Sequence, residues 1–187
     1  MIHKIAVIIG STRPSRVGDK VAEWYVNKLA NVKDAQLEII DLLSENLPFL
    51  NEPSPASSGQ YSLDRTKKWS EKIDSFDAFV WVTPEYNHSA PASLTNAISY
   101  LNKEWQRKPV ALVSYGSMGG VRAAEHLRAI AGELYMADIR PQVAIRLLWE
   151  MFDDAGDIRS DLIWGDPKEQ INELLWRSDA LKSARQG

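Results

Sequence analysis

The residues best suited to bind a ligand follow the first apolar run of the chain. That run, residues 5–9, is mostly β-branched, which predicts a strand buried on both faces, and Gly10 ends it. The next residues bring hydroxyl and guanidinium groups close together: Ser11, Thr12, Arg13, Ser15 and Arg16, with Val17 at the start of an amphipathic segment. Phosphate binds such groups together with the free backbone amides at a helix N-terminus. The stretch therefore predicts a phosphate-binding site.

Two common phosphate-binding motifs are excluded by the positions of the glycines. The Walker motif needs Gly-Lys-Ser/Thr after its first glycine and four further residues, whereas the next glycine after Gly10 is Gly18, which Asp19 follows. The dinucleotide fingerprint needs a second glycine two residues after the first, where this chain has Thr12. The loop therefore fits a mononucleotide. Taken alone, it fits equally an ordinary strand-to-helix turn in which Ser15 caps the helix.

The composition describes one globular domain over residues 1–187. The chain has 187 residues, 44% of them hydrophobic, and no long linker between its periodic segments. A net charge of −3 and a pI near 5.7 argue against nucleic acid and against an anionic membrane surface as partners. No signal peptide precedes the first strand, and no apolar run reaches the roughly 18 residues that span a bilayer. We therefore expect a cytoplasmic protein.

Nothing in the sequence predicts a metal site. The chain has no cysteine, which excludes disulfides, thiol catalysis and thiolate ligands. Its histidines, His3, His88 and His126, do not have the spacing of metal ligands. The acidic segment 153–157 lacks the residue order of an EF-hand loop, so we expect a solvated turn there.

Predicted strands alternate with predicted helices along the chain. Apolar runs predict strands at 5–9, 36–42, 76–83, 110–114 and 141–145. Apolar residues at helical spacing predict helices at 17–32, 64–75, 92–101, 123–134 and 168–185, and residues 43–62 form a long irregular connection. This alternation predicts parallel βαβ units and a three-layer α/β/α fold. Its sheet would be doubly wound, parallel and five-stranded, in the flavodoxin-like order 2-1-3-4-5.

The first, third and fourth strands are neighbours in that order. The loops after residues 9, 83 and 114 leave the carboxyl ends of these strands, so they meet in one crevice where the strand order reverses. Open α/β sheets bind ligands at this position. All three loops are rich in glycine, proline and polar residues. Their convergence favours a binding site over an ordinary turn at the first loop.

The three loops resemble the signature of a known family. Residues 10–16 (Gly-Ser-Thr-Arg-Pro-Ser-Arg), 84–89 (Pro-Glu-Tyr-Asn-His-Ser) and 114–120 (Ser-Tyr-Gly-Ser-Met-Gly-Gly) are similar to those of the NADPH-dependent FMN reductase family. That family is flavodoxin-like and includes quinone, azo-dye and chromate reductases. The resemblance extends from the first strand to the helix after the fourth, and it implies FMN as cofactor with NADPH or NADH as electron donor.

The resemblance also implies roles for the residues of each loop. Those implied to hold the FMN phosphate are Ser11, Thr12, Arg13, Ser15 and Arg16, with amides near Val17. Those implied to border one side of the flavin ring are Pro84, Glu85, Tyr86 and Asn87. Those implied to line its other side are Tyr115, Gly116, Ser117, Gly119 and Gly120. Glycines let the backbone approach a flat ligand, and a tyrosine such as Tyr86 or Tyr115 can cover its face.

Each of these roles has a structural alternative. Gly119 and Gly120 would equally suit a loop that enters a helix, Pro84 would end a strand, and Tyr115 would lie at the edge of the core. His88 could face the flavin or a substrate, or it could hydrogen-bond within its own loop. We assign no catalytic role to any side chain, because the flavin carries the chemistry.

The implied reaction is hydride transfer from NAD(P)H to the flavin, followed by transfer of two electrons to a small-molecule acceptor at the same site. Ping-pong kinetics follow from a shared site, and a quinone, azo, chromate or flavin acceptor fits the family. The resemblance further implies a homodimer or homotetramer, for which residues 43–62 and 147–152 are candidate contacts. Two alternatives stay open: a flavodoxin-type electron carrier, and a flavin-dependent interaction protein that senses redox state.

Overall fold

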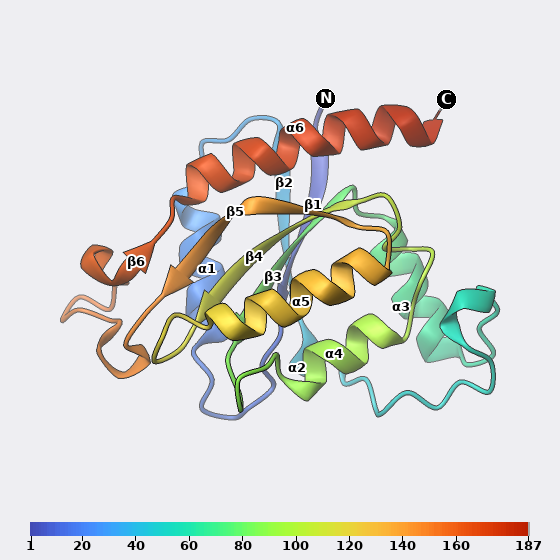
Figure 1. Ribbon diagram of the computed structural model, residues 1–187, viewed down its shortest axis with the longest axis horizontal. Helices are drawn as coiled ribbons and strands as arrows, with labels where there is room; N and C mark the ends of the chain where they lie inside the picture. Colours follow the sequence, from blue (N-terminus) through green and yellow to red (C-terminus); the bar gives the residue numbers. More distant parts are fainter. Residues whose placement is uncertain (187) are drawn as a thin grey trace.

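The computed structural model describes residues 1–186 and is built around a six-stranded sheet with helices on both faces (Figure 1). The strands are β1 (His3–Ile9), β2 (Ala35–Asp41), β3 (Ala78–Pro84), β4 (Pro109–Tyr115), β5 (Ala137–Ile145) and β6 (Ile163–Trp164). Their order in the sheet is β2-β1-β3-β4-β5-β6. The first five strands are parallel, and β6 runs antiparallel to β5.

The helices form the two outer layers. They are α1 (Gly18–Lys28), α2 (Leu42–Glu45), α3 (Asp64–Asp74), α4 (Ala92–Ser99), α5 (Val121–Glu133) and α6 (Pro167–Gln186), with short 3-10 turns η1 (Ala56–Ser58), η2 (Leu148–Glu150) and η3 (Ser160–Leu162). Helices α1 and α6 pack on one face of the sheet, and α3, α4 and α5 pack on the other. The predicted three-layer, flavodoxin-like fold is confirmed.

The core explains why the strands were predictable. All seven residues of β3 and all seven of β4 are buried, as expected for central parallel strands covered by helices on both sides. Apolar side chains divide into two clusters, one on each face of the sheet. Strands with two buried faces are apolar at successive positions, and that pattern was visible in the sequence.

The prediction of five strands was wrong by one. After β5 the chain turns back, and Ile163 and Trp164 pair with Ile145 and Ala144 at the edge of the sheet. Two residues are too few to show a period in sequence. The strand ends at Gly165, which has φ +89° and lies so close to Gln142 that an added Cβ would be 2.0 Å from the carbonyl oxygen.

Two boundaries also differ from the predictions. The first helix ends at Lys28 rather than near residue 32, because the chain leaves the helix at Leu29 in a tight turn. Strand β5 begins at Ala137, four residues before the predicted start at Pro141. Proline lacks a donor for strand pairing, but it is tolerated here because β6 covers only the last two residues of β5.

Among the helices of residues 1–186, none is long and apolar enough to cross a membrane.

The two ends of the chain are joined by a buried histidine. His3 begins β1 and is almost fully buried; its Nε2 lies 2.7 Å from Asp179 Oδ1, and its Nδ1 lies 2.9 Å from Ser178 Oγ, both on α6. Asp77 is also close, 3.8 Å from Nδ1, and it pairs with Lys182 at 2.9 Å. This cluster holds α6 against the amino ends of the strands.

We expect His3→Leu to lower the free energy of unfolding by about 1 to 3 kcal/mol, because it leaves the buried Ser178 hydroxyl and the Asp179 carboxylate without their partner. Urea unfolding followed by far-UV circular dichroism measures the change. His126→Ala, on the exposed face of α5, is the matched control and should stay within about 0.5 kcal/mol of the wild type. Equal midpoints for His3→Leu and wild type would contradict the role given to this cluster.

Candidate active site at the carboxyl ends of the strands

The three predicted loops meet at one end of the sheet. Strand β1 pairs with β3, and β3 pairs with β4, so the loops that follow them are neighbours. The first two loops touch directly: Ser11 Oγ lies 2.7 Å from the Tyr86 hydroxyl oxygen, and the Arg13 guanidinium lies 5.6 Å from the centre of the Tyr86 ring. Convergence of these loops at the point where the strand order reverses is confirmed.

The first loop presents unpaired backbone amides. Helix α1 begins after Val17 without a side-chain cap, and its first backbone hydrogen bond runs from Val21 N–H to Val17 C=O. Within residues 1–186, no acceptor is bonded to the amides of Ser11, Thr12, Ser15 or residues 17–20. Ser15 is exposed and does not cap the helix, so the alternative of an ordinary capped turn is not what the structure shows. These amides and the helix dipole favour an anion.

The two arginines of this loop have different surroundings. Arg16 is only 11% exposed; its Nη2 donates to Asp41 Oδ2 at 2.5 Å, which ties the loop to the end of β2, while its buried Nε has no partner in the described chain. Arg13 is exposed, and no carboxylate of residues 1–186 lies within 4 Å of its guanidinium. Arg13 is therefore the cation that is free to bind an added anion.

The second loop is a tight hairpin. Tyr86 and Ser89 exchange two backbone hydrogen bonds, and Asn87 and His88 between them have φ values of 52° and 65°. Positive φ at both central residues is typical of a type I′ turn, which favours asparagine at its first central position. His88 is exposed at the tip, whereas Pro84 is buried at the end of β3 and Tyr86 is half-buried. The Tyr86 ring is the part of this loop that lies against Arg13 of the first loop.

Glu85 points toward α5. Its Oε1 accepts from Arg122 Nε at 2.6 Å, and its Oε2 accepts from the Arg122 backbone amide at 3.1 Å. The carboxylate is largely buried and occupies the N-terminus of α5, where a negative charge is favourable. The Glu85 side chain therefore fixes the second loop to α5, and its backbone is what remains to border a ligand.

This ion pair predicts acid sensitivity. Burial raises the pKa of the Glu85 carboxyl, but the hydrogen bonds and charge of Arg122 outweigh burial and hold the pKa below its usual value of 4.5. A lowered pKa contributes stability above the unfolded-state value, and this contribution is lost as the pH falls through the folded-state value. We therefore expect Glu85→Gln to lose less stability than the wild type on acidification below about pH 4.5.

Urea unfolding at pH 7, 4.5 and 3.5 measures this difference. The exposed Glu133→Gln on α5 is the control and should follow the wild type at every pH. Identical pH dependence for Glu85→Gln and wild type would contradict the assignment.

The third loop combines a buried tyrosine with exposed residues. Tyr115 is 3% exposed, and its hydroxyl lies beneath the start of α1, 2.7 Å from where a Cβ on Gly18 would be. Burial raises the pKa of this phenol, so it stays neutral. Tyr115 therefore occupies the edge of the core, and of the two tyrosines considered for covering a ligand, Tyr86 is the accessible one. Ser117 is exposed, and Gly116, Gly119 and Gly120 form the turn into α5.

The geometry fits a phosphorylated ligand. The first loop has free amides, hydroxyls and an unpaired arginine. The backbone of the other two loops lies close to it. Asp41 and Arg122, which hold Arg16 and Glu85, were missed in the sequence, because their partners are distant along the chain. Ser93 was missed too; its hydroxyl donates to the Gly10 carbonyl and fixes the end of β1.

The sequence comparison decides the family. The sequence model of the NADPH-dependent FMN reductase family matches residues 3–150, which include all three loops. The chain belongs to the NADPH-dependent FMN reductase family. The prediction of an oxidoreductase that uses FMN and NAD(P)H is confirmed at the level of this family.

Individual relatives of this FMN reductase family member support the same family assignment. It is 41% identical over 130 residues to the NAD(P)H-dependent FMN reductase ntnL of Nectria sp., a match that spans 66% of this chain and 65% of the relative. It is 33% identical over 165 residues to a quinone reductase of Pseudomonas putida, across 84% and 85% of the two chains. The flavoenzyme NAD(P)H:(acceptor) oxidoreductase FerB of Paracoccus denitrificans shares the fold, with a TM-score of 0.67 at 23% identity over 96% and 95% of the chains.

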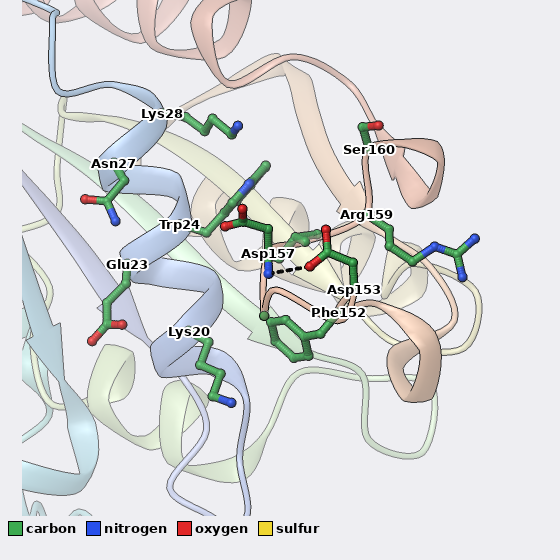
Figure 2. Close-up of a pocket in the computed structure, with 12 residues that line it drawn as sticks. Lys20, Glu23, Trp24, Asn27, Lys28, Phe152, Asp153, Asp157, Arg159 and Ser160 are labelled. Atoms are coloured by element: carbon green, nitrogen blue, oxygen red, sulfur yellow. Dashed lines mark hydrogen bonds between the residues drawn. The ribbon is translucent and has the colours of Figure 1, made fainter.

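Two cavities of this family member lie beside α1, α2 and α4, and neither was predicted. A groove of about 430 Å³ runs between α2 and α4 and includes Thr12. A cavity of about 640 Å³ lies along α1, away from the second and third loops. Figure 2 shows it between Lys20, Trp24 and Lys28 of α1 and residues 152–160. The Asp153 carboxylate there accepts the backbone amides of Ala155 and Asp157, which makes the acidic segment an exposed turn.

Proposed function

We propose that this chain is an FMN-dependent NAD(P)H oxidoreductase that reduces a quinone-type acceptor by two electrons. The observation that carries the proposal is the first loop, where free amides at the uncapped start of α1 adjoin the unpaired Arg13 and the Ser11 hydroxyl. Family membership and the matches to FMN and quinone reductases support it. Azo compounds, chromate and free flavin are further acceptors of the same class.

Different site residues would bind the phosphate and the flavin ring of the cofactor. The proposed phosphate ligands are Ser11, Thr12, Arg13, Ser15 and the amides of residues 17–20, with Arg16 held in place by Asp41. The backbone of 84–87 and 116–120 would border the flavin ring, and Tyr86 would lie against it. The glycines keep side chains out of this crevice, and Glu85 and Arg122 fix the distance between its two sides.

Bound FMN supplies the capacity to accept a hydride and to release two electrons. The overall reaction balances as NAD(P)H, one proton and a quinone going to NAD(P)⁺ and a hydroquinone. No side chain needs to act as a nucleophile. The exposed turn at Asn87 and His88 leaves the crevice open to water, which provides the second proton. One site that serves donor and acceptor in turn gives ping-pong kinetics.

Location and assembly complete the proposal. The proposed location is cytoplasmic. A homodimer or homotetramer would cover Phe49, which is 81% exposed in the 43–62 connection, and the exposed Trp149.

Steady-state kinetics test the proposed reaction. NADPH oxidation by the FMN-loaded protein, at several fixed concentrations of 1,4-benzoquinone, should give parallel double-reciprocal lines. Intersecting lines would contradict a shared site. Absence of NADPH oxidation, together with bound flavin, would instead support the electron-carrier alternative.

A further inference from the structure

A small cavity shares a wall with the third loop. Its volume is about 360 Å³, and it is lined by Met118, Val121, Ala144, Arg146, Ile163 and Trp164. Met118 belongs to the loop itself, and a Cβ on Gly119 would lie 3.5 Å from Arg146 Cγ, so the stem of Arg146 runs along the loop. The cavity therefore lies directly beside the backbone proposed to border the flavin ring.

Its lining combines apolar surface with one charge. Trp164 is 66% exposed and Met118 is 64% exposed, so both side chains leave apolar surface accessible at this cavity. Arg146 is the charged residue of the lining. Aromatic and thioether side chains contact flat rings well, and a guanidinium pairs with an oxyanion.

Arg146 is free to bind an added anion. Its hydrogen bond to the Asp161 carbonyl, at 3.3 Å, leaves most of the guanidinium unpaired, and no carboxylate of residues 1–186 lies within 4 Å of it. The Asp161 carboxylate itself is bound by Arg159 at 2.8 Å. Within residues 1–186, the Arg146 guanidinium therefore has no direct ion pair, although its charge helps to lower the pKa of Asp161 from a greater distance.

The position of Trp164 follows from the fold. Strand β6 pairs Trp164 with Ala144, whose small side chain leaves the space above it open, and the close packing of Gly165 on Gln142 prevents the strand from shifting. Trp164 also lines a second cavity, whose charged lining residues are four carboxylates and three arginines: Glu125, Asp138, Asp166, Glu169, Arg128, Arg140 and Arg177. Of these two cavities, only the one lined by Arg146 includes a residue of the third loop, Met118.

We propose that this cavity binds the acceptor, and that it selects planar aromatic quinones carrying one negative charge. The ring would lie against Trp164 and Met118, with the charge on Arg146. The proposal rests on the function proposed above and names its substrate class. NAD(P)H supplies two electrons and one proton as hydride, water supplies the second proton, and the quinone anion becomes the corresponding hydroquinone anion.

The test compares two quinones that differ in charge. 2-Hydroxy-1,4-naphthoquinone is an anion at neutral pH, and 1,4-naphthoquinone is neutral. We expect Arg146→Gln to raise the KM for the anionic quinone about tenfold while the KM for the neutral quinone changes less than about twofold and kcat is kept. Trp164→Ala should raise both KM values. Added salt should raise the KM for the anion alone.

The controls are Arg140→Gln, which removes an exposed arginine of β5 that does not line this cavity, and Trp176→Ala, which removes a tryptophan that is also 66% exposed but lies on α6. Neither should change either KM. Equal effects of Arg146→Gln on both quinones, or no effect, would overturn the proposal and leave the proposed reductase function standing.

A binding measurement separates the two proposals. Calorimetric titration of the full chain, freed of FMN, with each quinone should show tighter binding of the anion, and this preference should disappear in Arg146→Gln. If the protein binds the anion in this way but oxidises no NADPH, the reductase function fails and the binding site stands. Equal affinity for both quinones in the wild type would overturn the site.

Discussion

Replacing Arg13 with alanine is expected to weaken FMN binding by about 10- to 100-fold, the effect of losing one hydrogen-bonded charge pair. Arg13 has no carboxylate partner among the described residues and lies over Tyr86, so its removal breaks no ion pair of the protein. Stability without FMN should therefore stay within about 0.5 kcal/mol of the wild type. Titration of FMN fluorescence against the FMN-free protein measures the affinity.

Two further variants sharpen this result. Arg13→Lys keeps the charge but loses the planar fork, so it should fall between wild type and alanine. Arg16→Ala should weaken binding and also lower stability, because it leaves Asp41 without its partner. Unchanged affinity in Arg13→Ala would mean that the first loop does not hold the phosphate.

Two glycines, one just before α5 and one inside it, are expected to respond in opposite directions to alanine. Gly120, just before α5, has φ +69°, and an added Cβ would lie 2.8 Å from the Tyr115 nitrogen and 2.9 Å from its carbonyl oxygen. Because both atoms are backbone, Gly120→Ala should lower the free energy of unfolding by about 2 to 4 kcal/mol. The third loop must shift as a result, so FMN affinity should fall too.

Gly132, inside α5, is the matched control. An added Cβ there meets nothing within 4 Å, and glycine is a poor helix former, so Gly132→Ala should raise stability by up to about 1 kcal/mol. Urea unfolding measures both variants. A small effect of Gly120→Ala would show that the backbone around Tyr115 is more adaptable than the close contacts imply.

The sequence allowed prediction of the features that depend on local pattern. The fully buried β3 and β4 are continuous apolar runs, and their alternation with helices gave the strand order and the place where the loops meet. The phosphate loop was visible because its donors are consecutive residues. Strand β6 was missed because two residues carry no period.

Side-chain directions depend on tertiary contacts and were not predictable. Glu85 and Arg122 are 37 residues apart, and Arg16 and Asp41 are 25 apart, so no local sequence pattern predicts either ion pair. Tyr115 follows an apolar strand and precedes a glycine-rich loop, a position compatible with both core and crevice. The Tyr115 hydroxyl lies close to Gly18 at the start of α1, and this contact places Tyr115 in the core.

The most direct test of the central claim is an absorbance spectrum of the purified protein. The protein is mixed with FMN, desalted, and then titrated with NADPH under anaerobic conditions. We expect flavin to remain bound and its visible absorbance to bleach with about one equivalent of NADPH, because hydride transfer moves two electrons. A protein that retains no flavin, or whose bound flavin stays oxidised with NADPH, would contradict the account.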